Sequence, residues 1–548
     1  MVMRLSNPGR RIPMPGLLAL VFFLVAGKIS RAEDSCAEPV KTLDGPVAGI
    51  SEPGAAACAY QGIPYAAPPV GPLRFRPPEP PATHPELLQA DRFKPWCAQP
   101  LYPGILERND RSYPISEDCL YLNIWRPRAT PGKLPVMFFI HGGGLRAGSA
   151  STGMYRGERL ADREKVVVVT INYRLGALGF ISLPALSDED PHHSSGNYGL
   201  LDQLAALQWV KHNIAAFGGD PDNVTIFGES AGAWSVCDLL ASPLAQGSFA
   251  KAIIQSGGCD TTKPLEQGYA DGEKFARRLG CSGPDAPACL RGKSIREILS
   301  AQFQEAKSSV WNFNSMLSYL WIPKEDGWAL KEPPIESLQS GRFNQVPLLV
   351  GSDRDEVKIF SVNIYGVRLL PPPILNWELA RTFGDKTAGG LKRLYPYRRY
   401  RRPTDAVIDA LGDATLACKC YDAAEAVTPF QPVYYYRFDY DRHLAPHRFG
   451  AGHGLEIPFI FDTFDQPDFN RFFNPHYVSL AKDLSDAMMK YWANFARTGN
   501  PNGPGLMDWP SYDPQHRTRM YLDLPQKVQA TDNIEKCEFW KEQGITLK

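Results

Sequence analysis

The sequence TIFGESAGAW, residues 225–234, places Ser230 between Gly228 and Gly232, directly after a run rich in apolar residues. This is the Gly-x-Ser-x-Gly pattern, in which a strand turns sharply into a helix and leaves a serine hydroxyl exposed at the turn. Glycines flank such a serine because the strand and the helix approach so closely that a Cβ atom would clash. The five residues alone also fit an ordinary glycine-containing turn, so the context has to decide.

That context favours a nucleophilic serine. Residues 223–227 form a short apolar run that predicts a buried strand entering the turn. Residues 231–240 follow with apolar side chains at helical spacing, which predicts a helix leaving it. A strand, a glycine-flanked serine and a helix in this order are the surroundings that the pattern requires.

Composition limits the kind of partner. The chain has 548 residues, with 59 Lys and Arg against 59 Asp and Glu, so its formal net charge is zero. This balance does not favour nucleic acid or an anionic membrane as a partner, and a small-molecule substrate is expected instead. The sequence has no linker, internal repeat or low-complexity tract that would divide it, so one large α/β unit is expected.

The N-terminus has the order of a secretory signal peptide. Arg4, Arg10 and Arg11 precede an apolar stretch at residues 17–27, and small residues follow at positions 30 and 32. We therefore expect a signal peptide over residues 1–32 and one mature domain over residues 33–548. The expected product is secreted or periplasmic, without a membrane anchor, since the apolar core is too short to span a bilayer comfortably.

Eleven cysteines follow the expected cleavage point, which suits an oxidising compartment and leaves at least one thiol unpaired. No Cys-x-x-Cys pair with matching histidines accompanies them, so no metal site is expected, and nothing in the sequence calls for a cofactor.

A serine nucleophile needs donors for the oxyanion, a base and an acid. Residues 136–140 predict a buried strand that ends in His-Gly-Gly-Gly at 141–144, the type of loop that supplies backbone N–H groups to an oxyanion. Downstream, an apolar strand at 346–351 is followed by three carboxylates, and spacing alone does not choose among them: Asp353, Asp355 and Glu356. His453, in the small-residue loop Gly-Ala-Gly-His-Gly, is a candidate base.

These residues resemble the type-B carboxylesterases, the cholinesterase-like branch of the α/β-hydrolases. The resemblance spans nearly the whole mature chain and includes the following stretches: YQGIPYAAPPVGPLRFRPPEP, SEDCLYLNIWRP, HGGGLRAGSA, NYRLGALGF, VPLLVGSDRDE, GAGHGLEIPFIF and YWANFARTGNPN. It implies an α/β-hydrolase fold, with a large, mostly parallel central sheet flanked by helices and helical insertions around an active-site gorge. It also implies a secreted serine esterase that forms an acyl-enzyme.

The resemblance assigns the catalytic roles. It implies Ser230 as nucleophile, His453 as base and Glu356 as the acid that orients it. The oxyanion donors it implies are the backbone N–H groups of three residues: Gly143, Gly144 and Ala231.

Four further residues are expected at the substrate pocket: Glu229, as a second carboxylate, with Leu145, Arg146 and Trp234. The sequence departs from the family at two positions. Val357 stands where glycine is common, and Leu145 stands where an aromatic residue usually follows the glycine loop.

Two disulfides follow from the resemblance, Cys97 with Cys119 and Cys281 with Cys289, and it also suggests a structural salt bridge between Arg74 and Glu117. Cys36 with Cys58 is plausible across neighbouring strands. One more pair is open among Cys418, Cys420 and Cys537.

The ester remains open at this stage. Choline esters are disfavoured because residues 98–118 contain Tyr102 and Tyr113 but no tryptophan to stack on a cation. Arg146, Arg108 and Arg111 are either solvated surface residues or contacts for a carboxylated acyl group. The second reading would suit a relative of the exported bacterial esterases that remove tricarballylate from fumonisins.

Particular residues of the chain disfavour two rival functions. A non-catalytic cholinesterase-like adhesion module is disfavoured because Ser230, Glu356 and His453 are all present. An interfacial lipase is disfavoured because the segment between Cys97 and Cys119 is charged and contains proline, whereas a lipase lid would be apolar.

Overall fold

The apolar runs that precede the glycine loop, the serine and the acidic cluster become parallel strands of one sheet. The computed structural model describes residues 36–51, 56–100, 114–128, 130, 132–307, 320–360 and 370–545. The expected signal peptide, together with Arg108 and Arg111, lies outside these residues.

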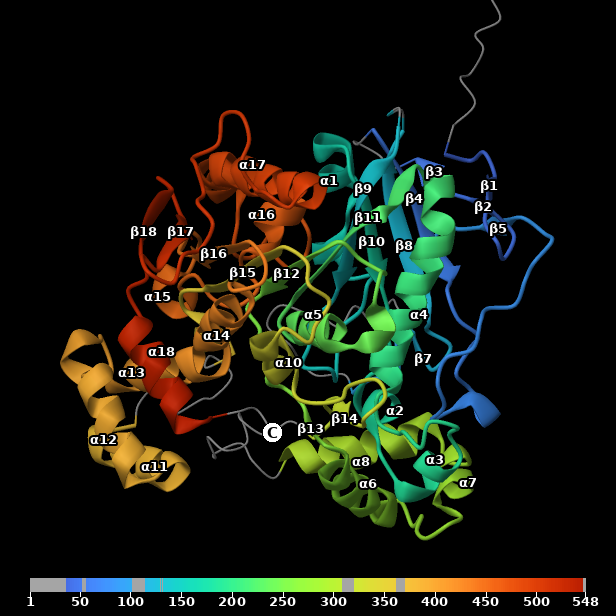
Figure 1. Cartoon of the computed structure of the whole chain (residues 1–548), viewed down its shortest axis with the longest axis horizontal. Helices are drawn as coiled ribbons and strands as arrows, with labels where there is room; N and C mark the ends of the chain where they lie inside the picture. Colours follow the sequence, from blue (N-terminus) through green and yellow to red (C-terminus); the bar gives the residue numbers. More distant parts are fainter. Residues whose placement is uncertain are drawn as a thin grey trace, which may run out of the picture.

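The main sheet has eleven described strands (Figure 1). Their spatial order is β18 (Lys527–Ala530), β17 (Thr518–Leu522), β16 (Val433–Phe438), β15 (Leu348–Asp353), β12 (Lys251–Gln255), β11 (Gly219–Glu229), β9 (Leu134–Ile140), β10 (Val167–Ile171), β8 (Tyr121–Pro127), β4 (Ala57–Pro64) and β3 (Ile50–Ser51). The strands from β17 to β10 pair in parallel, and antiparallel strands complete both edges. The mostly parallel sheet of an α/β-hydrolase is therefore confirmed.

Helices cover both faces of the sheet because alternate side chains of its central strands are apolar on both sides. One face packs against α4 (Tyr198–Asn213), α5 (Ala231–Ala241), α10 (Pro334–Ser340) and α14 (Cys418–Val427). The other face packs against α1 (Glu158–Glu164), α16 (Ile457–Phe461) and α17 (Pro475–Thr498). In β15, Leu348 and Val350 belong to the first core and Leu349 to the second.

Two groups of helices lie beyond these layers, at the lower right and lower left of Figure 1. The first contains α2 (Gly176–Phe180), α3 (Pro184–Asp188), α6 (Leu265–Arg278), α7 (Ala286–Arg291) and α8 (Ile295–Lys307). The second contains α11 (Pro372–Phe383), α12 (Asp385–Leu394), α13 (Pro403–Gly412) and α18 (Ile534–Gln543). None of the helices among the described residues is both long and apolar enough to cross a membrane.

All eleven cysteines lie in the described ranges, and ten of them form disulfides: Cys36–Cys58, Cys97–Cys119, Cys237–Cys259, Cys281–Cys289 and Cys418–Cys537. Cys420 keeps a buried free thiol. The pairs implied by the resemblance are present. Cys237–Cys259, which the sequence analysis did not identify, ties the helix after the serine to the segment after β12.

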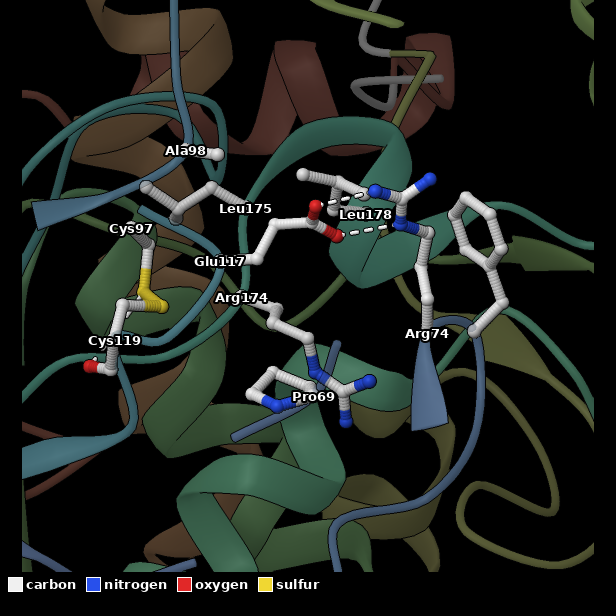
Figure 2. A pocket seen from close by; sticks show the side chains of 10 residues that line it. Pro69, Arg74, Cys97, Ala98, Glu117, Cys119, Arg174, Leu175 and Leu178 are labelled. Carbon is white, nitrogen blue, oxygen red and sulfur yellow. Dashed lines mark hydrogen bonds and ion pairs between the residues drawn. A yellow bond between two sulfur atoms is a disulfide. The ribbon is translucent and has the colours of Figure 1, made fainter. Parts of the chain in front are cut away.

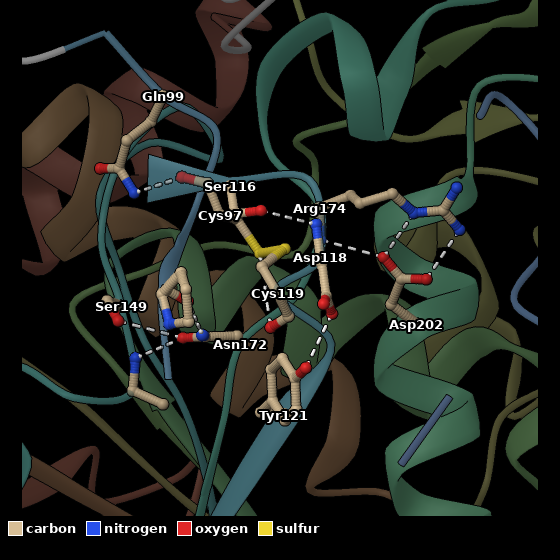
Figure 3. Close-up of a disulfide and its surroundings, with 12 residues drawn as sticks. Cys97, Gln99, Ser116, Asp118, Cys119, Tyr121, Ser149, Asn172, Arg174 and Asp202 are labelled. Atoms are coloured by element: carbon tan, nitrogen blue, oxygen red, sulfur yellow. Dashed lines mark hydrogen bonds and ion pairs between the residues drawn. A yellow bond between two sulfur atoms is a disulfide. The ribbon is translucent and has the colours of Figure 1, made fainter. Parts of the chain in front are cut away.

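Buried ion pairs fix the loops around the Cys97–Cys119 disulfide. Figure 2 shows Arg74 facing Glu117, and its Nε and Nη2 atoms donate to the two carboxylate oxygens at 2.6 and 2.5 Å. Figure 3 shows the neighbouring pair, in which Arg174 donates to Asp202 at 2.8 and 2.7 Å. Asp202 is completely buried, so its charge depends on this partner.

We expect Arg174→Met to lower the free energy of unfolding by about 3–5 kcal/mol, because it leaves the Asp202 carboxylate buried without a counter-charge. The measurement is urea unfolding followed by tryptophan fluorescence. Arg277→Met is the matched control, since its ion pair with Glu273 is exposed and contributes at most about 1 kcal/mol. Equal losses in the two variants would contradict this assignment.

Candidate active site

Ser230 occupies a strained turn between β11 and α5. Its φ of +58° and ψ of −125° lie in a region that side-chain-bearing residues rarely adopt. The turn is held by hydrogen bonds on both sides, because Ser230 N donates to Gln255 O at 2.9 Å and Ser230 O accepts from Ala233 N at 2.9 Å. The serine therefore sits at the junction that the sequence pattern predicts.

The two glycines of the pattern are required by contact with the backbone. A Cβ atom on Gly232 would lie 2.0 Å from the carbonyl oxygen of Ile140, the last residue of β9. A Cβ atom on Gly228 would lie 2.5 Å from the carbonyl of Gly232. Both distances are far inside van der Waals contact, so the central strand can meet the helix only if both residues lack a side chain.

The glycine loop after β9 lies directly against this turn. A Cβ atom on Gly142 would lie 2.9 Å from Glu229 O and 3.0 Å from the Cβ atom of Ser230. Gly143 and Gly144 have φ angles of +104° and +64°, and no oxygen in the described part of the chain accepts a hydrogen bond from their N–H groups. The N–H of Ala231, in the first turn of α5, has no partner within the helix.

His141 supports the glycine loop. Burial lowers the pKa of His141 to about 4, so the ring is neutral at neutral pH. It stacks on Tyr173 with a centroid separation of 4.4 Å, and the Tyr173 hydroxyl donates to His141 O at 2.8 Å. These contacts indicate a structural role for this histidine.

The structure separates the three acidic candidates after β15. The Asp355 carboxylate accepts from Ala451 N at 2.9 Å and pairs with Arg354 and Lys358, so it braces the loop that carries His453. Asp353 is buried at the end of the strand. Only Glu356, of these three, contacts His453, with Oε2 at 2.6 Å from Nδ1.

The other ring nitrogen of His453 faces a second carboxylate. Nε2 lies 3.1 Å from Oε1 of Glu229, the residue before the serine. Burial acts to lower the pKa of His453, but the Glu229, Glu356 and Glu456 carboxylates outweigh it and raise this pKa to about 9. The site therefore favours a positive imidazolium.

The expected pocket residues differ in their surroundings. Leu145, with a φ of +57°, and Trp234 belong to the main hydrophobic core and are 0% and 3% exposed. Arg146 follows Leu145 just after the glycine loop and has an intermediate exposure, and its backbone N–H donates to Gly143 O. The place of these residues in a substrate pocket stays a prediction.

Gln255 and Glu456, which no sequence pattern indicated, are both buried, and Glu456 lies near His453. Gln255 Nε2 donates to Glu456 Oε1 at 3.0 Å, and Trp492 Nε1 donates to Gln255 Oε1 at 3.1 Å. Glu456 stands three residues after His453 at the start of an apolar run, and a lone carboxyl group in such a run was the available signal. Among the described residues, no group of three or more His, Cys, Asp or Glu side chains is arranged to hold a metal ion.

The sheet, the strained serine and the glycine loop define an α/β-hydrolase. A sequence profile described as the carboxylesterase family matches residues 37–540, and the chain belongs to this family.

Relatives of known activity cover nearly the whole chain. Para-nitrobenzyl esterase of Bacillus subtilis is 36% identical over 501 residues, which are 91% of this chain and 97% of that protein. Human cocaine esterase is also 36% identical, over 95% of this chain and 94% of its own. Acetylcholinesterase of Bungarus fasciatus is 35% identical, over 92% of this chain and 89% of that protein.

Solved structures agree with these relatives. A thermophilic para-nitrobenzyl esterase superposes with a TM-score of 0.80 at 35% identity, over 92% of this chain and 100% of that one. A carboxylesterase of Geobacillus stearothermophilus superposes with a TM-score of 0.80 at 34% identity, over 92% of this chain and 99% of that one. The protein is a carboxylesterase of the serine ester hydrolase type.

We expect Glu229→Gln to lower the pKa of His453 by about one unit, because it removes one of the carboxylates that stabilise the imidazolium. The measurement is an NMR titration of protein with isotope-labelled histidine, and Glu273→Gln on the exposed side of α6 is the control. The raised pKa also stabilises the fold fully below about pH 6.5, and this contribution is lost as the pH rises towards 9. An unchanged titration in Glu229→Gln would contradict the assignment.

Proposed function

We propose that this carboxylesterase cleaves esters through a Ser230–His453–Glu356 triad and an acyl-enzyme intermediate. The observation that carries the proposal is the 2.6 Å contact between His453 Nδ1 and Glu356 Oε2. The other ring nitrogen of His453, Nε2, faces Glu229, the residue before Ser230. In this arrangement Glu356 fixes the tautomer of the ring and leaves Nε2 to act as the base.

In the first half of the reaction, Ser230 Oγ attacks the ester carbonyl while His453 Nε2 takes its proton. The N–H groups of Gly143, Gly144 and Ala231 donate to the oxyanion that develops on the carbonyl oxygen. Glu356 and Glu229 stabilise the imidazolium, which is the reason for placing two carboxylates against one ring. The imidazolium then protonates the leaving alcohol, and the acyl group remains on Ser230.

In the second half, water replaces the alcohol. His453 takes a proton from the water, which attacks the acyl-enzyme carbonyl, and the same backbone donors stabilise the second oxyanion. The acid is released when His453 returns the proton to Ser230. The triad residues and donors argue against a non-catalytic adhesion module, since such a module has no need of them.

Export through the signal peptide at residues 1–32 is part of the same proposal. Five disulfides form and persist in an oxidising compartment such as the periplasm or the extracellular space.

We expect Ser230→Ala to reduce kcat for a para-nitrophenyl ester by about 10⁴-fold or more, because the nucleophile is lost while the backbone of the turn is retained. Activity is measured by release of para-nitrophenol, and circular dichroism establishes that the variant is folded. A folded variant that kept a tenth of the activity would refute Ser230 as the nucleophile.

For the substrate, we propose an ester whose acyl part carries a carboxylate, as the tricarballylate esters of fumonisins do. Arg146 supports this proposal because it lies two residues after the glycine loop and the residue is neither fully exposed nor fully buried. A guanidinium at this position could bind a carboxylate through two parallel hydrogen bonds.

We expect Arg146→Ala to lower kcat/KM for a carboxylate-bearing ester by about 10- to 100-fold, which corresponds to roughly 1.5–3 kcal/mol for hydrogen bonds to a charged group. A neutral butyrate ester should be hydrolysed as before, and the ratio between the two substrates is the measured quantity. Equal losses on both esters would mean that Arg146 supports the glycine loop, and no loss on either would remove the anionic substrate from consideration.

A further inference from the structure

A second pair of buried carboxyl groups, Asp353 and Glu456, lies beside the Glu356–His453 pair. We propose that Asp353 is a neutral carboxylic acid that donates its proton to an ionised Glu456, and that it thereby acts as a positioning residue that controls the basicity of His453. This inference rests on the proposed role of His453 as the base.

The fold brings these two groups to the same place. Asp353 ends β15 on the same face of the sheet as Leu349, towards the layer formed by α16 and α17. Glu456 immediately precedes α16 in the loop that carries His453. Both side chains are buried, with 1% and 0% exposure, and the backbone N–H of Asp353 donates to Glu356 Oε1 at 2.9 Å.

The hydrogen bonds around Glu456 leave one of its oxygens without a donor. Trp492 donates to the carbonyl oxygen of the Gln255 amide and so turns its NH₂ group towards Glu456 Oε1. Glu456 Oε2 and both carboxylate oxygens of Asp353 have no hydrogen-bond partner among the described residues. Two ionised carboxylates can only accept hydrogen bonds, so one of them must hold a proton before the pair can bond.

The charge balance of the site also requires a proton. Four buried carboxyl groups form this cluster: Glu229, Glu356 and Glu456 act on the single imidazole of His453, and Asp353 lies next to Glu356 and Glu456. The Tyr436 hydroxyl also faces the pair and the Cys420 thiol lies near Glu356, and burial raises the pKa of both, so they add no positive charge. A cluster with one imidazolium and four carboxylates would bury a net charge of about −3, which is too costly to persist.

The nearby cations are paired elsewhere. Asp353 and Glu356 line a polar cavity of about 150 Å³ that is also lined by Arg354, Arg437 and Lys536. These three form ion pairs with other carboxylates, among them Asp441, Asp532 and Asp413. No ion pair with Asp353 is formed by these cations among the described residues, so a charge on Asp353 would remain uncompensated.

The hydrogen bonds favour the proton on Asp353, because the Gln255 NH₂ group donates to Glu456 and stabilises its ionised form, whereas no donor among the described residues reaches the Asp353 carboxylate oxygens. Burial and the Glu456 and Glu356 carboxylates raise the pKa of Asp353 well above its usual range. Burial also raises the pKa of Glu456, but the nearby His453 favours its ionised form. An ionised Glu456 then adds a negative charge beside His453 and helps to raise its pKa.

The protonation state of Asp353 can be read directly by infrared difference spectroscopy between Ser230→Ala and Ser230→Ala/Asp353→Asn at neutral pH. We expect the Asp353→Asn substitution to remove a carboxylic acid C=O band. The matched control, Asp355→Asn in the same background, should remove carboxylate bands, because Asp355 is ion-paired. Removal of carboxylate bands by Asp353→Asn would overturn the inference. Since this readout needs no turnover, it is independent of whether Ser230 is the nucleophile.

The effect on His453 is read from the pH profile of kcat/KM in the otherwise unchanged protein. Asp353→Leu removes the donor, so Glu456 should take up a proton itself and the acid limb of the profile should move to lower pH by about one unit. Asp353→Asn supplies an amide donor to Glu456 and should restore the wild-type limb. A shift of equal size in both variants would overturn the role of the donated proton, and circular dichroism establishes that both are folded.

Discussion

Three backbone segments pack in van der Waals contact against the turn at Ser230, and the rest of the site depends on this contact. The end of β9 touches Gly232 at the start of α5, the glycine loop touches Ser230, and β12 accepts the hydrogen bond from Ser230 N. The positive φ of Ser230 is the backbone strain that this close packing requires. Because Gly142 touches Glu229 and Ser230, the glycine loop that carries the proposed oxyanion donors, Gly143 and Gly144, is held against this turn by backbone contact.

The negative charge around His453 is the second constraint. Glu229 and Glu356 approach opposite nitrogens of one ring, and Glu456 lies in the same loop. These carboxylates raise the pKa of His453, so the arrangement favours the imidazolium over the neutral base. The proton that we propose on Asp353 reduces the net negative charge of this cluster. Asp353 would thereby influence the protonation equilibrium of His453 without contacting the substrate.

Much of the fold could be predicted because its decisive signals are local. The apolar run before the glycine loop and the one around residues 346–351 became β9 and β15, and the turn at Ser230 follows from two glycines and their neighbours. The choice among Asp353, Asp355 and Glu356 could not be made from spacing, because it depends on where a loop about a hundred residues later returns to the sheet. Only the resemblance pointed to Glu356.

The same limit explains what was missed. Cys237–Cys259 and the Gln255–Glu456 contact join segments whose proximity is set by the packing of α5, β12 and α16 against the sheet. Leu145 and Trp234 are buried in the main hydrophobic core, and their expected place at a substrate pocket stays a prediction.

Cys420 lies two residues from the Cys418–Cys537 disulfide, a place where an odd thiol could scramble the pairing by thiol–disulfide exchange. In the folded protein, burial raises the pKa of this thiol, and its Sγ lies 3.1 and 3.2 Å from the carbonyl oxygens of Gly257 and Gly351. The attacking species, a thiolate, is therefore scarce as long as α14 stays packed on the sheet. Fidelity of the disulfide pattern thus becomes a property of the native state: it is protected after folding is complete and vulnerable only while the chain is still open.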